Sequence, residues 1–214
     1  MVFSHDTSAG IEPTAPTLGA APGLSGRVRG LLLNPKSEWR QVALESTTAT
    51  RLFTGYVMPL AGIAVLAALL RLWLATRVSV GGALLMIALT FAFEVVGVCV
   101  VALIINSLAS FFRGVYSQGQ ALKVATYAFT PLWLSCVFIP FPSLSLSAQF
   151  FGGVYHTYLL YLGLRVLMKS PPDRALGYAS TVVLCSILLG IMFTQVGAGV
   201  GETLLHLSHF RALN

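Results

Sequence analysis

Residues 124–164 read VATYAFTPLWLSCVFIPFPSLSLSAQFFGGVYHTYLLYLGL, a stretch of 41 residues without Asp, Glu, Lys or Arg. The hydrocarbon core of a bilayer is about 30 Å thick, and a helix crosses it with about 20 apolar residues. The stretch is therefore long enough for two membrane-spanning helices. Pro140, Phe141 and Pro142 lie near its middle and form the predicted turn between the two spans.

Three other stretches contain at most one charged side chain each. Residues 52–70 and 175–201 contain no charged side chain, and residues 78–112 contain only Glu94. With 56% hydrophobic and 9% charged residues, the chain has too little polar surface to cover the core of a soluble domain. The sequence therefore predicts an all-α fold, a polytopic membrane protein built as a bundle of five transmembrane helices. The predicted spans are residues 55–75, 82–105, 121–140, 147–168 and 176–198.

The regions outside the spans differ in composition. Residues 1–26 are rich in Ala, Pro, Gly, Ser and Thr and show no hydrophobic periodicity, so we expect a disordered cytoplasmic tail. Residues 27–50 are expected to form an interfacial amphipathic segment and residues 51–199 the five-helix domain. Residues 200–214 are expected to form a short amphipathic tail on the outer side.

The distribution of Lys and Arg predicts the orientation. With the N-terminus in the cytoplasm, ten basic residues fall on the inner side and three on the outer side, the bias expected of membrane proteins. The inner ten are Arg27, Arg29, Lys36, Arg40, Arg51, Arg113, Lys123, Arg165, Lys169 and Arg174, and the outer three are Arg71, Arg77 and Arg211. The inner face is expected to favour lipids of an anionic leaflet. No basic run is dense enough to predict binding to nucleic acid.

The segment before the first span begins with a helix signal. Asn34 can cap a helix whose first position is Pro35. Trp39 then lies on one face of this helix, while Lys36 and Arg40 point elsewhere. Such a helix suits the headgroup layer and predicts docking to the membrane surface through these three residues. A simple lead-in to the first span explains the pattern equally well.

Glu94 is the most informative single residue, because it falls near the centre of the second predicted span. A carboxylate there costs about 2.5–3.5 kcal/mol on insertion scales, so it must face protein or water. His156 lies at a comparable depth in the fourth span, and the two side chains together can share a proton near the bilayer midplane. Alternatively, Glu94 joins helices by bonding to a Ser, Thr or Tyr hydroxyl.

Four other residues complete the candidate intramembrane polar group. Thr130 and Pro131 break a helical hydrogen bond at mid-depth, where the freed carbonyl can line a cavity. Asn106 and Tyr127 are the remaining members of the group.

No metal or cofactor is expected. Glu202, His206 and His209 lie at i, i+4 and i+7 after the last span, a spacing that can hold a divalent cation. The leucines around them favour instead an interfacial helix with solvated histidines. The sequence contains no catalytic or phosphate-binding motif of a common class, so an enzyme is not expected either.

The order and spacing of several short motifs resemble the Yip family of Ypt/Rab-interacting proteins, in the style of its bacterial members. The resemblance covers about residues 30–195 and is carried by four groups. The first group is Asn34-Pro35-Lys36 and Trp39, followed by Tyr56 and Pro59-Leu60-Ala61. The second is Asn106-Ser107-Leu108-Ala109 with Phe112-Arg113-Gly114, and the third is Gln120-Ala121-Leu122-Lys123 with residues 127–134. The fourth is Tyr155 with residues 158–164, Met168 and residues 175–178.

This resemblance implies a five-helix membrane domain with a cytoplasmic N-terminus, in agreement with the charge distribution. For a bacterial member it implies the inner membrane and a periplasmic C-terminus. Eukaryotic members act in vesicle traffic, bind prenylated Rab GTPases and associate with one another. This chain lacks their long acidic cytoplasmic region and their Asp-Leu-x-Gly-Pro motif, so binding of a Rab-type GTPase is not expected.

Two functions agree with these features. The first is a non-enzymatic membrane organiser or scaffold that associates with itself, with other membrane proteins and with lipids. The second is a small transporter or channel with a proton-linked site at Glu94 and His156. A continuous cavity that reaches Glu94 would favour the transporter, and a Glu94 sealed among apolar groups and bonded to a hydroxyl would favour the organiser.

Overall fold

The computed structural model describes residues 23–75 and 80–213, and these residues form helices and connections without a β-strand. The elements in chain order are α1 (Leu24–Leu33), α2 (Pro35–Leu44), α3 (Ala49–Leu52), the π-helical segment η1 (Phe53–Val57), α4 (Met58–Ala75), α5 (Val80–Leu108), α6 (Gln118–Ala128), α7 (Thr130–Ser135), the 3₁₀ segment η2 (Cys136–Phe138), α8 (Pro142–Val166) and α9 (Pro172–Leu213).

Within these described residues, four helical segments are long and apolar enough to cross a membrane. They are Ala49–Arg71, Gly81–Leu108, Gln118–Phe138 and Pro172–Gly197. These segments coincide with four of the five predicted spans, so the chain is an all-helical membrane protein. The remaining predicted span is occupied by α8, whose serines, Gln149 and His156 make it more polar than the other four.

Prolines explain why two of these segments are irregular. Pro59 has no N–H, so the carbonyl of Gly55 four residues earlier lacks its usual helical donor. The missing hydrogen bond is accommodated in η1, the π-helical turn that joins α3 to α4. Pro131 has the same effect at the boundary between α6 and α7, where Phe129 lies between the two helices.

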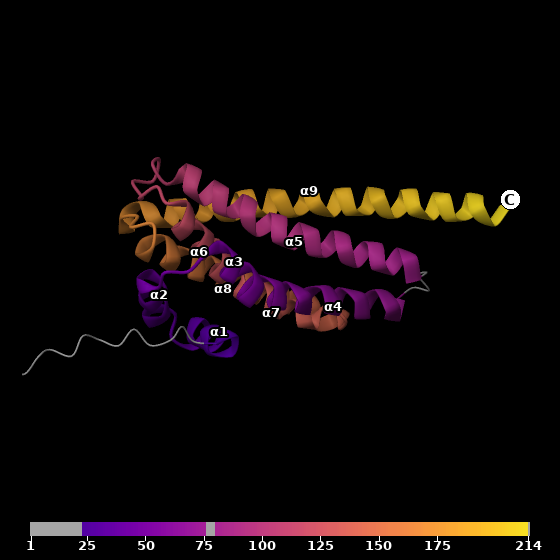
Figure 1. Ribbon diagram of the computed structural model, residues 1–214, viewed down its shortest axis with the longest axis horizontal. Coiled ribbons are helices and arrows are strands. Elements are labelled where there is room, and N and C mark those ends of the chain that lie inside the picture. Colours follow the sequence, from indigo (N-terminus) through magenta and orange to yellow (C-terminus); the bar gives the residue numbers. More distant parts are fainter. Residues whose placement is uncertain (1–22, 76–79, 214) are drawn as a thin grey trace, which may run out of the picture.

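The long helices α4, α5 and α9 run along the long axis of the molecule, and α2 and the far end of α9 lie at opposite ends of it (Figure 1). α5 packs against α6 and α9, and α8 packs against α2, α6, α7 and α9. The buried core is drawn mainly from the second halves of α5 and α8, from α6, and from the first turns of α9, and α1, α2, α7 and the start of the first span add further residues. The core therefore lies at the α2 end of the bundle.

Two connections are tied together at this same end. The N–H of Val115, between α5 and α6, donates to the carbonyl of Met168, between α8 and α9, at 2.7 Å. The Ser170 hydroxyl donates to the Phe112 carbonyl at 3.1 Å, and the Phe112 ring stacks on Tyr178 with centroids 4.8 Å apart. A Cβ at residue Gly114 would stand 3.0 Å from the Met168 carbonyl oxygen, so glycine permits this close approach.

Candidate functional site

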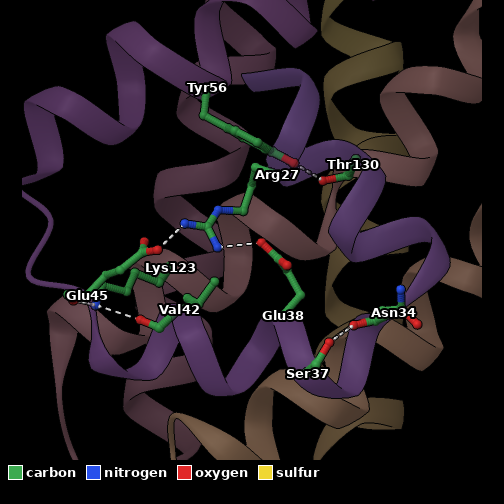
Figure 2. A network of polar contacts seen from close by, with 9 residues as sticks. All are labelled: Arg27, Asn34, Ser37, Glu38, Val42, Glu45, Tyr56, Lys123 and Thr130. Carbon is green, nitrogen blue, oxygen red and sulfur yellow. Dashed lines mark hydrogen bonds and ion pairs between the residues drawn. The ribbon is translucent and has the colours of Figure 1, made fainter. Parts of the chain in front are cut away.

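A group of four charged side chains, three of them buried and the fourth, Glu45, partly exposed, joins the N-terminal helices to the bundle. We call it the Arg27 cluster, and it consists of Arg27, Glu38, Glu45 and Lys123 (Figure 2). Nη1 of Arg27 donates to Oε1 of Glu38 at 2.6 Å, and Nη2 of Arg27 donates to Oε1 of Glu45. The Arg27 and Glu38 side chains are only 3% and 8% exposed. One arginine from α1 thus bridges two carboxylates from α2 and its C-cap.

Lys123 brings α6 into the same cluster. Its Nζ donates to the backbone carbonyl of Val42 at 3.2 Å and to that of Glu45. These carbonyls lie at the C-terminal end of α2, where the last backbone acceptors lack helical donors and the helix dipole is negative. The ammonium therefore satisfies acceptors that burial would otherwise leave unpaired.

The charges of the cluster balance, since two cations face two carboxylates. Burial alone would lower the pKa of Arg27, but the Glu45 hydrogen bond and the negative charges of Glu45 and Glu38 raise this pKa above its ordinary value. The guanidinium is therefore charged at every physiological pH. A buried ion pair of this kind stabilises little compared with apolar packing, but loss of one partner costs about 3–5 kcal/mol.

Gly30 makes room for this contact. A Cβ at Gly30 would stand 2.2 Å from Oε2 of Glu38, inside the space that the carboxylate occupies. α1 therefore approaches α2 closely at a position of its second turn that carries no side chain.

The aromatic ring of Tyr127 packs against the Arg27 cluster. The guanidinium carbon of Arg27 lies 5.4 Å from the Tyr127 ring centroid, within the range of a cation–π contact. The rings of Tyr56 and Trp39 meet Tyr127 edge-on, with centroids 4.8 Å and 6.3 Å away. Tyr127, expected in the intramembrane polar group, thus lies between the Arg27 cluster and the bundle.

Trp39 is fully buried, whereas the sequence predicts headgroup contact for it. Its ring lies against Gly163 of α8, where an added Cβ would stand 2.8 Å from the indole. The amphipathic face of α2 therefore packs on the protein. Lys36 and Arg40 are exposed on the other side of the helix, so any docking to the membrane surface rests on these two cations.

The break at Pro131 frees two carbonyls, and side chains take up both. The Thr130 hydroxyl donates to the Tyr127 carbonyl at 2.7 Å, and the Tyr56 hydroxyl, 2.7 Å from the Thr130 hydroxyl, then donates to it (Figure 2). Nδ1 of His156 lies 2.8 Å from the Ala128 carbonyl oxygen. Because a carbonyl can only accept, Nδ1 carries the proton in this contact. Both carbonyls freed at Pro131 therefore have side-chain hydrogen-bond partners.

Glu94 and His156 do not meet. Oε2 of Glu94 accepts a hydrogen bond from the indole N–H of Trp133 at 2.9 Å, and within residues 23–75 and 80–213 no hydrogen bond or ion pair joins it to His156. The ring of Phe129 lies 4.9 Å from the His156 ring and also lines the cavity that Glu94 faces. Glu94 thus joins α5 to α7 through an indole instead of a hydroxyl.

Glu94 lines a cavity of about 400 Å³ between α5 and α9, which we call the α5–α9 cavity. Thr90 and Phe93 of α5 also line it, and so do Ser186 and Phe193 of α9. Phe93 and Phe193 stack across the two helices with centroids 4.7 Å apart.

The remaining candidate residues are separate from these sites. Asn106 is buried, and its Oδ1 has no hydrogen-bond partner in the described part of the chain. The backbone of Glu202, His206 and His209 belongs to α9, but their side chains lie outside the described residues. In the part of the chain that is described, no three His, Cys, Asp or Glu side chains come together as metal ligands.

Sequence reasoning missed the Arg27 cluster. One feature of the sequence does point to such a cluster. Lys123 lies inside the third predicted span, where a cation needs an anionic or hydrogen-bonding partner. The nearest acidic residues before the first span are Glu38 and Glu45.

Comparison with curated proteins and with solved structures found no match. Comparison with protein families found one, described as the Yip1 domain, over residues 29–194. These limits include α2 with Trp39, the four membrane-crossing segments up to the middle of α9, and three residues of the Arg27 cluster. The match covers well over half of the chain, and the chain therefore belongs to the Yip1 domain family.

Proposed function

We propose that the protein is a non-enzymatic membrane organiser that associates with itself, with other membrane proteins and with lipids. The observation that carries this proposal is the Arg27 cluster. Its ion pairs join α1 to α2, and the hydrogen bonds of Lys123 to two backbone carbonyls fix α2 to α6 at the end of the bundle, as expected of a rigid surface for contacts. Family membership supports the proposal at the level of the fold.

The surface so fixed is both basic and apolar. Arg29, Lys36 and Arg40 are exposed on α1 and α2, and Leu44 is 77% exposed. Phe111 and Tyr116, on the connection between α5 and α6, are 76% and 74% exposed. Cations beside exposed aromatic and aliphatic side chains suit the headgroup region of an anionic leaflet.

The sides of the bundle favour lateral contacts. In the most apolar part of α5, and likewise of α9, only 17% of the residues are buried within the chain. Lipid or other transmembrane helices must therefore cover most of both helices. Close packing between helices is one way for a membrane protein to use such surfaces.

The topology proposed with this function has five spans, a cytoplasmic N-terminus and a C-terminus on the outer, periplasmic side of a bacterial inner membrane. α8 is the proposed fifth span, because its 25 residues make a helix of about 37 Å at about 1.5 Å per residue. Its polar His156 is buried against the bundle, which reduces the cost of a less apolar sequence. A tag at each terminus should react with impermeant reagents from opposite sides, and reaction from one side would contradict the topology.

Self-association can be measured by energy transfer between two separately labelled pools of the protein in liposomes. We expect transfer that persists when the protein is diluted with lipid, and that is stronger in anionic than in zwitterionic liposomes. A variant with Arg29, Lys36 and Arg40 all replaced by Gln should lose this lipid dependence, since the three exposed cations are its proposed source. Transfer that falls to the random-collision level on dilution would contradict the organiser.

The α5–α9 cavity favours a second candidate, a transporter that uses Glu94. The separate partners of Glu94 and His156 mean that a proton relay between them needs a rearrangement. Proton flux into liposomes should then exceed leak in the wild type and fall to leak in Glu94→Gln. Leak-level flux in both would exclude this candidate and leave the organiser unaffected.

A further inference from the structure

The α5–α9 cavity contains a carboxylate but, among its described residues, no cationic side chain, and the proposed organiser function does not involve this cavity. Glu94 lies at the midpoint of α5 (Val80–Leu108), and residues 175–201 of α9 opposite contain no charge. None of the described residues that line the cavity is Lys, Arg or His. The carboxylate therefore faces a space within the bilayer without a protein cation to neutralise it.

The hydrogen bonds around Glu94 leave acceptors unused. Its Oε2 accepts from the Trp133 indole, while no described side chain donates to Oε1. Glu94 is only half-buried, so its remaining lone pairs reach the cavity. A carboxylate in a medium of low dielectric constant is stabilised only when it gains further donors, a cation or a proton.

Two of the hydroxyls in the same cavity add further acceptors. Ser186 donates its proton to the Val182 carbonyl at 2.8 Å, and Thr194 donates to the Gly190 carbonyl at 2.9 Å. Because these two hydroxyls already use their protons, they are available to a ligand as acceptors. A ligand that brings N–H or O–H donors therefore fits this part of the cavity.

The rest of the lining is aromatic and aliphatic. Phe93, Phe129 and Phe193 present rings to the space, and Met86 and Leu89 complete one wall. Ring faces attract cations, and aliphatic walls suit a hydrocarbon chain. The volume of about 400 Å³ lies within the range of small-molecule sites.

We propose that the α5–α9 cavity binds the ammonium group of a lipophilic primary amine, with Glu94 as its counterion and the hydroxyls of Ser186 and Thr194 as further acceptors. An ammonium group brings three N–H donors and one positive charge, which match the acceptors and the missing cation. An alcohol of equal chain length lacks the charge, and a quaternary ammonium ion lacks the donors.

The experiment uses the full chain in nanodiscs of zwitterionic phosphatidylcholine, so that anionic lipid does not bind the probe. The probe is dansylcadaverine, a primary amine with a fluorescent apolar body, detected by energy transfer from tryptophan. We expect saturable binding that dodecylamine displaces and dodecanol does not. Absence of saturable binding, or equal displacement by the alcohol, overturns the proposal.

Three variants locate the site. Glu94→Gln should raise the Kd at least about tenfold, because it removes the charge but keeps the size of the side chain. Gly190→Leu should weaken binding similarly, since the added side chain enters a cavity where a Cβ at Gly190 meets no atom within 4 Å. Asp173→Asn makes the same carboxylate-to-amide change at an exposed position and should bind like the wild type.

Unchanged binding in Glu94→Gln or in Gly190→Leu overturns the proposal, and so does equal loss in Asp173→Asn. The melting temperature of each variant shows whether it is folded. If Glu94→Gln does not fold, Gly190→Leu, which leaves every hydrogen bond of the cavity in place, decides the question.

Discussion

Trp39 of α2 and Gly163 of α8 touch so closely that an added Cβ at the glycine would stand 2.8 Å from the indole. The indole is fully buried and rigid, so it cannot move aside as a long flexible side chain would. The contact fixes how deeply α2 sits on the bundle, and with it the position of the Arg27 cluster.

Gly163→Ala should therefore destabilise the protein. Overpacking in a dense core costs about 1–3 kcal/mol, which exceeds the gain of about 1 kcal/mol that alanine brings to a helix. Gly153→Ala in the same helix is the matched control, because an added Cβ there meets nothing within 4 Å. Thermal unfolding in detergent should show a lower melting temperature for the first variant and an equal or higher one for the second. The reverse order would contradict the packing argument.

Arg27→Ala should cost about 3–5 kcal/mol, because it leaves the buried carboxylate of Glu38 and the partly exposed carboxylate of Glu45 without their cation. Arg29→Ala, two residues further along α1, removes an exposed cation and should leave the melting temperature unchanged. The double variant Arg27→Met with Glu38→Leu should recover part of the loss, since apolar side chains can replace a buried ion pair. No recovery would mean that the pair does more than avoid unpaired charge.

Thr130→Val should cost about 1–3 kcal/mol in the free energy of unfolding. The valine has the same shape, but it leaves the Tyr127 carbonyl and the Tyr56 hydroxyl without their buried partner. Thr181→Val is the control, because the Thr181 hydroxyl bonds only to the Gly177 carbonyl of its own regular helix. Equal melting temperatures for the two variants would show that the break at Pro131 does not need this hydroxyl.

Trp39→Ala should release α2 from α8, because truncation of a buried tryptophan costs about 3–5 kcal/mol. Protease added to inside-out vesicles should then cleave faster near residue 40. Trp73→Ala removes a tryptophan that is 77% exposed and should leave the rate unchanged. Equal rates for wild type and Trp39→Ala would show that α2 is held by the Arg27 cluster alone.

The sequence predicts the membrane-crossing helices well and their polar contacts poorly. Charge-free stretches such as 52–70 and 175–201 determine where helices lie, since a bilayer tolerates little else. The amphipathic pattern of residues 27–50 shows only that Trp39 lies on an apolar face. Such a face can pack against a membrane or against protein, and the pattern does not distinguish the two. In the structure, Trp39 packs against Gly163.

Hydrogen-bond partners depend on how helices cross, which local sequence does not contain. Glu94 was expected to meet a hydroxyl or His156, but α7 places the Trp133 indole beside it instead. Lys123 lies 81 residues from Val42 in the chain, so no periodicity links them. Several basic residues precede the first span, and their sequence pattern does not distinguish the buried Arg27 from the exposed ones.

The Lys123 contacts also limit when α2 can attach to the bundle. The acceptors at Val42 and Glu45 precede Lys123 by 81 and 78 residues, so α2 leaves the ribosome long before its anchoring lysine is made. This attachment can therefore form only after α6 has been synthesised, although α2 is one of the first helices of the chain.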